Sequence, residues 1–347
     1  MLVDLGSGQV LEARDVDRSF PPASMTKVMT AYVALEEMAR GKLKPDRMFV
    51  VPEAIASEWK GKGTSLFLSA GDKITADELL HGITTVSAND ASVVLATGYA
   101  GSVDAWSFLM NDTARRLGMT HTRYNTPNGW PDEGRTYVSA SDLVKLAAAL
   151  IRRHPDGYAE YFGKKRLTWN GRTQENHDPT VGIVDGADGI KTGYTREAGY
   201  NFLGSAKRDG RRLVLVIGGA RSARQRAEAA RALFEWGFGE WKARPLFKKG
   251  AIVTTARVQG GASRDVPVFA STPVYAAIPV DESEPLSLRL QYKGPVVAPV
   301  RKGAKIAELE IRVGDMPRSR IPLYAASEVA KANLFQRLAA GLSDLFT

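Results

Sequence analysis

The chain has 347 residues and a mass of 37.7 kDa, which is more than one ordinary domain needs. Hydrophobic residues make up 44% and charged residues 24%, so a disordered or collagen-like chain is excluded. The absence of cysteine excludes disulfides, thiol catalysis and cysteine-bound metal centres, and the net charge of +9 suits an anionic membrane or an acidic polymer.

Several further partners and locations are made less favourable by the sequence. None of the four histidines pairs with another at metal-ligand spacing, which argues against a zinc hydrolase. The positive charge is spread out and no nucleic-acid-binding motif accompanies it, so DNA and RNA are the least favoured partners. No stretch approaches the roughly 20 apolar residues of a spanning helix. No charged and apolar signal pattern precedes the first predicted strand, so we expect either a cytoplasmic protein or an exported one whose secretion signal has been removed.

The first part of the chain mixes helix and strand patterns. Leu2 to Leu5 predict a strand, and Thr75 with Glu78 predicts a capping box at a helix start. Apolar spacing predicts helices at 23–40, 75–80, 91–99, 103–117, 139–152 and 223–236. Alternating residues predict three neighbouring strands at 189–194, 200–207 and 212–218. We therefore predict an α+β domain over residues 1–243, with an antiparallel sheet flanked by helices.

The composition changes after Phe247, where valine, threonine, proline and glycine predominate. Short strand patterns separated by turns predict a small all-β sandwich domain over residues 244–325. The last segment, 326–347, places its leucines and phenylalanines near one helical face. This pattern predicts a C-terminal amphipathic helix, which either docks on its own domain or lies in a membrane surface.

Ser24 and Lys27 are the first pair of residues whose side chains could carry out catalysis together. They are three residues apart at a predicted helix start, so the hydroxyl and the amine share one face. A lysine made neutral by burial or by another cation could take the serine proton. Ser57 and Lys60 have the same spacing, but we interpret them as part of a surface turn. Taken alone, Ser24 would more often be a helix-capping serine than a nucleophile.

Two further motifs follow along the chain. Ser87 and Asn89 lie between two predicted helices, where a hydroxyl could relay a proton and an amide could hold a carbonyl, unless they simply cap a helix. Lys191, Thr192 and Gly193 lie on a predicted strand, whose edge could pair with an extended peptide. Together the three motifs follow the order that is typical of class A β-lactamases and penicillin-binding proteins.

The resemblance extends beyond these three motifs. Residues 18–32, 89–92, 125–129 and 188–195 closely resemble the low-molecular-mass D-alanyl-D-alanine carboxypeptidases, which are penicillin-binding proteins. The β domain and terminal helix also look like that family's stalk and membrane anchor. The resemblance implies a β-lactamase/transpeptidase-like catalytic domain and a serine-type carboxypeptidase that trims peptidoglycan stem peptides and is acylated by β-lactams. It also implies that no metal or organic cofactor is needed.

The family implies a role for each matching residue. Ser24 would be the nucleophile and Lys27 its base. Ser87 would pass the proton to the leaving D-alanine, and Asn89 would hold Lys27 and the substrate amide. Lys191 would set the local potential.

The resemblance also implies how substrate is held. Thr192 would meet the terminal carboxylate, and the backbone N–H groups of Ser24 and Tyr194 would form the oxyanion hole. The implied substrate-binding residues are Thr192, Gly193, Tyr194 and Thr195.

The chain departs from the family pattern around the substrate carboxylate. Family members often carry histidine where this chain has Asn128 and Tyr194, and often carry arginine within the stretch corresponding to 174–179. The cations that could replace that arginine are His177, Arg196, Arg221 and Arg224. The departures concern substrate preference and rate.

The implied location is the periplasmic face of the bacterial inner membrane. The alternatives are a β-lactamase, a DD-endopeptidase acting on cross-links, and a non-catalytic wall-binding module. No glutamate is clearly placed for the deacylation that class A β-lactamases perform, and Ser24, Lys27 and Lys191 are all present, which argues against a catalytically dead module.

Overall fold

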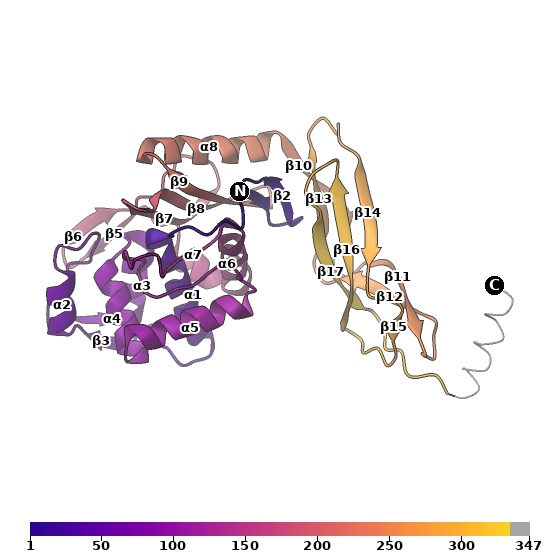
Figure 1. The fold of residues 1–347 in the computed structure, drawn as a ribbon, viewed down its shortest axis with the longest axis horizontal. Coiled ribbons are helices and arrows are strands. Elements are labelled where there is room, and N and C mark those ends of the chain that lie inside the picture. The colour runs from indigo at the N-terminus through magenta and orange to yellow at the C-terminus, as the bar shows by residue number, and fades with distance from the viewer. Residues whose placement is uncertain (334–347) are drawn as a thin grey trace. The chain divides into compact units, whose positions relative to one another are not determined.

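The computed structural model describes residues 1–333 (Figure 1). The chain folds into two compact units. The first comprises Met1–Val3 and Glu12–Gly237, and the second comprises Asp4–Leu11 together with the chain from Phe238 onward.

The first unit contains most of a five-stranded sheet with the strand order β2-β1-β9-β8-β7, of which Gln9–Leu11 on β2 are assigned to the second unit. Its strands are β1 (Leu2–Asp4), β2 (Gln9–Glu12), β7 (Ala187–Thr195), β8 (Gly199–Arg208) and β9 (Arg211–Ala220). The antiparallel trio predicted at 189–218 corresponds to β7, β8 and β9, whose central residues are buried.

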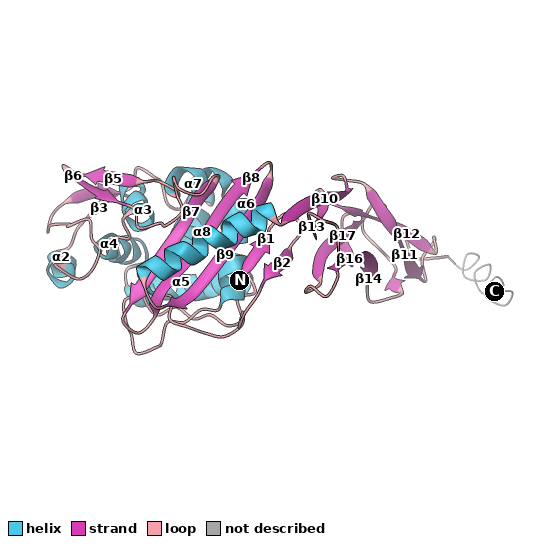
Figure 2. Ribbon diagram, turned by 90° about the horizontal axis from the view of Figure 1, so that it is seen from above, coloured by secondary structure: helices cyan, strands magenta, loops and turns pink. Residues whose placement is uncertain are grey.

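Helices cover both faces of this sheet. In Figures 1 and 2, α8 runs across strands β7 to β9 on one face, and α1, α6 and α7 lie beneath the other. The helices are α1 (Thr26–Ala39), α2 (Glu53–Trp59), α3 (Ala76–Thr85), α4 (Asn89–Ala100), α5 (Val103–Arg116), α6 (Ala140–Arg153), α7 (Pro155–Tyr161) and α8 (Ala223–Gly239).

Local sequence signals explain where several helices begin. Thr75 accepts a hydrogen bond from the Glu78 backbone and Glu78 reaches back to the Thr75 backbone, so the predicted capping box is confirmed. Ser102 caps α5 and Ser139 caps α6 in the same manner, through hydroxyl acceptors for otherwise unpaired N–H groups.

The structure differs from the sequence prediction at several places in this unit, including α7, for which no helix is predicted. Residues 23–40 begin with a separate 3₁₀ turn, Ala23–Met25, before α1. The surface turn predicted around Ser57 is wrong, because these residues belong to α2. Two short ladders, β3 (Met48–Val50) with β4 (Lys73–Thr75) and β5 (Arg166–Trp169) with β6 (Arg172–Glu175), have too few residues to produce a clear period.

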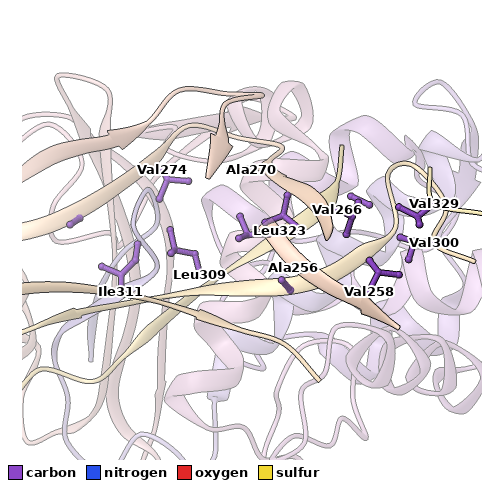
Figure 3. Close-up of a cluster of buried hydrophobic side chains, with 14 of the residues drawn as sticks. Ala256, Val258, Val266, Ala270, Val274, Val300, Leu309, Ile311, Leu323 and Val329 are labelled. Carbon is purple, nitrogen blue, oxygen red and sulfur yellow. The ribbon is translucent and has the colours of Figure 1, made fainter. Parts of the chain in front are cut away.

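The second unit is built from strands beyond α8. A six-stranded sheet has the order β14-β16-β17-β12-β11-β15, and β10 pairs with β13. The strands are β10 (Trp241–Phe247), β11 (Ile252–Gln259), β12 (Asp265–Ala270), β13 (Val274–Pro279), β14 (Leu286–Gln291), β15 (Val296–Val297), β16 (Lys305–Val313) and β17 (Ser319–Ala325). Valine, alanine and leucine side chains from these strands form the core shown in Figure 3, including Val266, Leu309 and Leu323.

The beginning of the predicted terminal helix is not helical. Val329 forms an isolated bridge with Val300, and Lys331 forms one with Gly261. Backbone pairing with the β unit takes precedence over the helical pattern here, so the predicted helix start at 326 is wrong. The rest of that prediction, 334–347, lies outside the described residues. Within residues 1–333, no helix is both long and apolar enough to cross a bilayer.

Candidate active site

The turn that carries Ser24 is fixed to the sheet before α1 begins. Ser24 lies in the 3₁₀ turn and Lys27 in the first turn of α1. Asn201, buried on β8, donates to the Pro21 carbonyl at 3.1 Å and accepts from the Gly219 N–H at 2.7 Å. Because the turn is held in this way, Ser24 Oγ lies 2.8 Å from Lys27 Nζ.

The surroundings of Lys27 define what its amine can do. Nζ also lies 2.7 Å from Asn89 Oδ1 and 2.8 Å from the Asn128 carbonyl oxygen. Both are carbonyl acceptors, whereas a serine hydroxyl can donate. A neutral amine has two protons and one lone pair, so two donated bonds leave the lone pair for the Ser24 hydroxyl.

The electrostatics favour that neutral form. Lys27 is completely buried, and burial is the main reason why its pKa lies well below the ordinary lysine value. The positive charge of Lys191 lowers the pKa further, and Asp90 opposes the shift. Lys27 is thereby adapted to accept a proton.

Ser87 and Asn89 occupy the turn before α4. Ser87 has a φ of 64°, a strained conformation for a non-glycine residue. The Asn89 N–H donates to the Thr64 carbonyl at 2.9 Å, and its Nδ2 donates to the Lys62 carbonyl at 3.1 Å. The N-cap of α4 is Ala88 without a side-chain hydrogen bond, so the alternative that Ser87 or Asn89 caps this helix is wrong.

Strand β7 forms the wall of the site opposite the turn that carries Ser24. Lys191 is 3% exposed, and burial lowers its pKa to about 7; Asp178 opposes this shift and Arg226 adds to it. A Cβ at Gly193 would lie 2.4 Å from the Pro22 carbonyl oxygen. Glycine therefore lets the strand approach the nucleophile turn closely.

The motif residues meet at one cavity of about 520 Å³. Its lining includes the predicted residues Ser24, Ser87, Asn89, Thr192, Gly193, Tyr194 and Thr195. Lys27 and Lys191 are buried beside it and act on it through hydrogen bonds and charge. The cavity thus joins a hydroxyl with a neighbouring amine on one wall to a strand on the other.

Comparison with known proteins agrees with this geometry. Residues 1–222 match the D-alanyl-D-alanine carboxypeptidase family, and residues 241–331 match the penicillin-binding protein 5 C-terminal domain. The chain belongs to the D-alanyl-D-alanine carboxypeptidase family.

Individual members of the family support the assignment along the whole chain. The D-alanyl-D-alanine carboxypeptidase DacD of Escherichia coli is 32% identical, over 100% of this chain and 89% of its own length. Penicillin binding protein 5 from Haemophilus influenzae superposes with a TM-score of 0.83 at 28% identity, covering 95% of this chain and 96% of its own.

A β-lactam complex is among the structural neighbours. A penicillin-binding protein of Listeria monocytogenes in the ampicillin-bound form has a TM-score of 0.62 at 29% identity, over 68% of this chain and 95% of its own. The predictions of a peptidase of this family, and of a mixed α/β part followed by an all-β part, are therefore confirmed.

The family pattern places an arginine in the stretch that here contains His177. His177 lines the cavity, but burial lowers its pKa, and Lys191 and Arg226 lower it further, so its imidazole is neutral near pH 7. The other predicted cations do not line the cavity and are exposed: Arg196, Arg221 and Arg224. Arg224 instead pairs with Glu228 on the same helix.

Arg226 is the cation that the sequence reasoning missed. It lines the cavity, is 8% exposed, and its Nε has no hydrogen-bond partner among the described residues. The helical spacing of Arg226 with Ala230 and Phe234 could have predicted its burial, because all three residues share the buried face of α8. Within residues 1–333 no carboxylate forms an ion pair with this guanidinium, although the charge of Asp178 acts on its pKa. A guanidinium buried beside a cavity in this way favours an anionic ligand.

Tyr194, the second position at which this chain differs from the family pattern, forms part of an aromatic stack. Its ring lies 4.2 Å from that of Tyr200, and the Arg226 guanidinium lies 5.9 Å from the Tyr200 ring centre. Tyr194 is 53% exposed and lines the cavity, so it offers a flat surface where the family often offers an imidazole.

Proposed function

We propose that the chain removes the terminal D-alanine from peptidoglycan stem peptides through an acyl-enzyme on Ser24. One observation carries this proposal: the Lys27 amine faces the Ser24 hydroxyl at 2.8 Å, while its other two contacts are carbonyl oxygens. The lowered pKa of Lys27 supports its role as a base near neutral pH.

In the first half-reaction, Lys27 accepts the proton of Ser24 as Oγ bonds to the carbonyl carbon of the penultimate D-alanine. The oxyanion accepts hydrogen bonds from the backbone N–H groups of Ser24 and Tyr194. The C–N bond then breaks, and the leaving D-alanine takes a proton relayed from Lys27 by Ser87. Asn89 holds both Lys27 and the substrate amide.

In the second half-reaction, water attacks the acyl carbon and gives its proton to Lys27. The ester bond to Ser24 breaks and the serine recovers its proton, so both half-reactions balance without a cofactor.

The other wall recognises the substrate carboxylate. Thr192 donates its hydroxyl, Arg226 supplies a guanidinium, and the protonated fraction of Lys191 adds positive potential. Gly193 leaves room for the extended peptide along β7, and Thr195 and Tyr194 border its path. The buried position of Arg226 and the low pKa of His177 support Arg226 as the principal charge.

The deciding experiment is an intact-mass spectrum after brief incubation with benzylpenicillin, with the modified peptide located. We expect an adduct on Ser24 that Ser24→Ala abolishes without loss of fold, and release of D-alanine from a D-Ala-D-Ala peptide. A persisting adduct in Ser24→Ala refutes that nucleophile. Unmodified protein with consumed antibiotic indicates a β-lactamase, and unmodified protein with intact antibiotic indicates a wall-binding module. Cleavage of cross-linked rather than linear peptides indicates an endopeptidase.

The domain roles and location are also proposed. We assign catalysis to residues 1–243, spacing to the β domain at 244–325, and membrane contact on the periplasmic face to the C-terminal segment. The apolar pattern of residues 334–346 and the net charge of +9 support contact with anionic lipid. Co-sedimentation with anionic vesicles tests this, since a chain ending at Asn333 is expected to lose binding; equal binding by both chains contradicts it.

A further inference from the structure

A second cavity of about 510 Å³ lies in the first unit, apart from the residues assigned to catalysis. Its lining includes three serines together with Glu53, Trp59, Lys60, Phe67, Asp90 and Arg172. Aromatic rings, hydroxyls and charges of both signs therefore share one hollow, which is the mixed character of a ligand site.

Phe67 is the least expected residue in this lining. Its φ is 60°, which is a strained backbone conformation for a bulky residue. Phe67 is 51% exposed, so it contributes much less hydrophobic stabilisation than a fully buried phenylalanine would. A strained backbone that presents an apolar ring to solvent is not explained by folding stability, and strain of this kind clusters at ligand sites.

The loop that presents Phe67 is firmly anchored. Asp90, buried on α4, accepts hydrogen bonds from Ser65 Oγ at 2.6 Å, the Leu66 N–H at 3.0 Å and the Leu68 N–H at 3.1 Å. Ser65 Oγ in turn accepts from the Phe67 N–H at 2.8 Å. The ring is thus held in a defined place, which reduces the entropic cost of binding.

The charges at this cavity are balanced and largely unpaired. Arg172 places its guanidinium 4.7 Å from the Phe67 ring centre. Within residues 1–333, no ion pair joins Lys60, Arg172 or Glu53 to another group, whereas the Asp90 carboxylate is fully engaged. Because the lining holds two cations and two carboxylates, it has no net preference for a charged ligand, but Lys60 and Arg172 offer donors and Glu53 offers an acceptor.

An aromatic wall links this cavity to the active-site cavity. Trp59 lines the former and Trp130 lines the latter, and their rings meet edge to face with centres 5.4 Å apart. Asp90 also follows Asn89 directly on α4. A polymer with its peptide end at Ser24 could therefore extend past Trp130 toward Phe67.

We propose that this second cavity binds an N-acetylated amino sugar of the glycan to which the stem peptide is attached. A sugar ring has an apolar C–H face that packs on an exposed aromatic ring, and a rim of hydroxyl and amide groups that hydrogen-bond to Arg172, Glu53 and the serines. The choice of glycan as the natural ligand rests on the proposed function, but binding of the sugar itself does not.

The test is titration calorimetry with a peptide-free N-acetylglucosamine tetramer, using the full chain and its Ser24→Ala variant. We expect binding by both, weakened roughly fivefold or more by Phe67→Gly because the stacking surface is lost. Glycine accepts the positive φ without strain, so Phe67→Gly retains or gains thermal stability. Arg172→Ala, which leaves the loop intact, is expected to weaken binding as well.

Matched controls exist in the same unit. Phe108, 65% exposed on α5, and Arg166, exposed on the same hairpin as Arg172, do not line the cavity. Phe108→Ala and Arg166→Ala are expected to bind like the parent chain. Equal affinity in all variants, or no heat of binding at millimolar tetramer, refutes the sugar site.

Two further binding measurements distinguish the ways in which the sugar site or the proposed function could be wrong. Sugar binding is expected to persist after benzylpenicillin acylation, and its loss would place the sugar in the active-site cavity and overturn the proposal. An acidic stem peptide without sugar that binds in a Phe67-dependent manner would assign the cavity to peptide instead. Failure of acylation with retained tetramer binding would refute the proposed function and leave the sugar site standing.

Discussion

The nucleophile side of the active cavity (Ser24, Lys27, Asn89) and its cationic side (Lys191, His177, Arg226) are built in different ways. On the nucleophile side, three short hydrogen bonds fix Lys27. On the cationic side, burial lowers the pKa of all three basic groups, Arg226 lowers the pKa of Lys191 and of His177 further, and Asp178 opposes the shift at Lys191 and Arg226. Arg226 Nε lacks a hydrogen-bond partner among the described residues. A fixed geometry suits proton transfer, whereas a buried cluster of basic groups suits an incoming anion.

The largest expected effect is on the nucleophile side. Lys27→Ala removes the base and leaves Asn89 without its main partner, so penicillin acylation should slow by about a thousandfold or more. Stopped-flow acylation kinetics measure this. Because the removed amine is buried, circular dichroism must show that the variant folds; a folded variant with parental acylation would assign the base to another group.

Arg226→Ala tests the cationic side and should act on substrate binding. Loss of the guanidinium is expected to reduce kcat/KM for a D-Ala-D-Ala peptide by about a hundredfold, since a charged hydrogen bond contributes roughly 1.5–3 kcal/mol. Arg224→Ala on the same helix is the control, because its side chain is exposed and paired with Glu228. Equal losses in both variants would indicate a general charge effect.

The pH dependence of stability should also reflect the cationic side. The folded pKa of Lys191, about 7, lies below its unfolded value of 10.5, so the unfolded chain binds more protons between these values. The free energy of unfolding should therefore gain up to about 1.4 kcal/mol per pH unit from Lys191 as the pH rises from about 7 toward 10. Lys191→Met should remove this contribution in denaturant titrations; an unchanged slope would contradict the lowered pKa.

The smallest expected effect concerns Tyr194. Tyr194→His restores the residue that the family often carries, and its imidazole has an ordinary pKa near 6.5. We expect a change of a few-fold in kcat/KM and a new limb in its pH profile around pH 6 to 7. Tyr194→Phe, which keeps the stack with Tyr200 and adds no titrating group, should show no such limb.

The two sides also differ in how far the sequence predicts them. Ser24 and Lys27 are neighbours in sequence, so helical spacing alone predicts their contact. Arg226 reaches the cavity only because α8 crosses the sheet, and two other arginines, Arg221 and Arg224, lie within five residues of it in the sequence. The contact between Lys27 and the Asn128 carbonyl involves backbone, which leaves no residue-specific signal.

The same reasoning applies to the fold. The strands β7 to β9 and most helices were predicted because they are long and periodic. The hairpin β5–β6, which carries Arg172, spans four residues on each strand and was missed. The helix predicted from 326 failed at its start because Val329 pairs with Val300, a contact between residues that the local pattern cannot relate.

Gly193 has a consequence for attempts to redesign this enzyme. The strand and the nucleophile turn approach so closely that any side chain there would collide with the Pro22 carbonyl, and Gly129 is equally constrained by the Ala23 carbonyl. A mutant library directed at these two glycines would mostly sample misfolded proteins. Selection for new acyl donors should instead draw its variants from Tyr194, Thr195 and Trp130, whose side chains border the cavity.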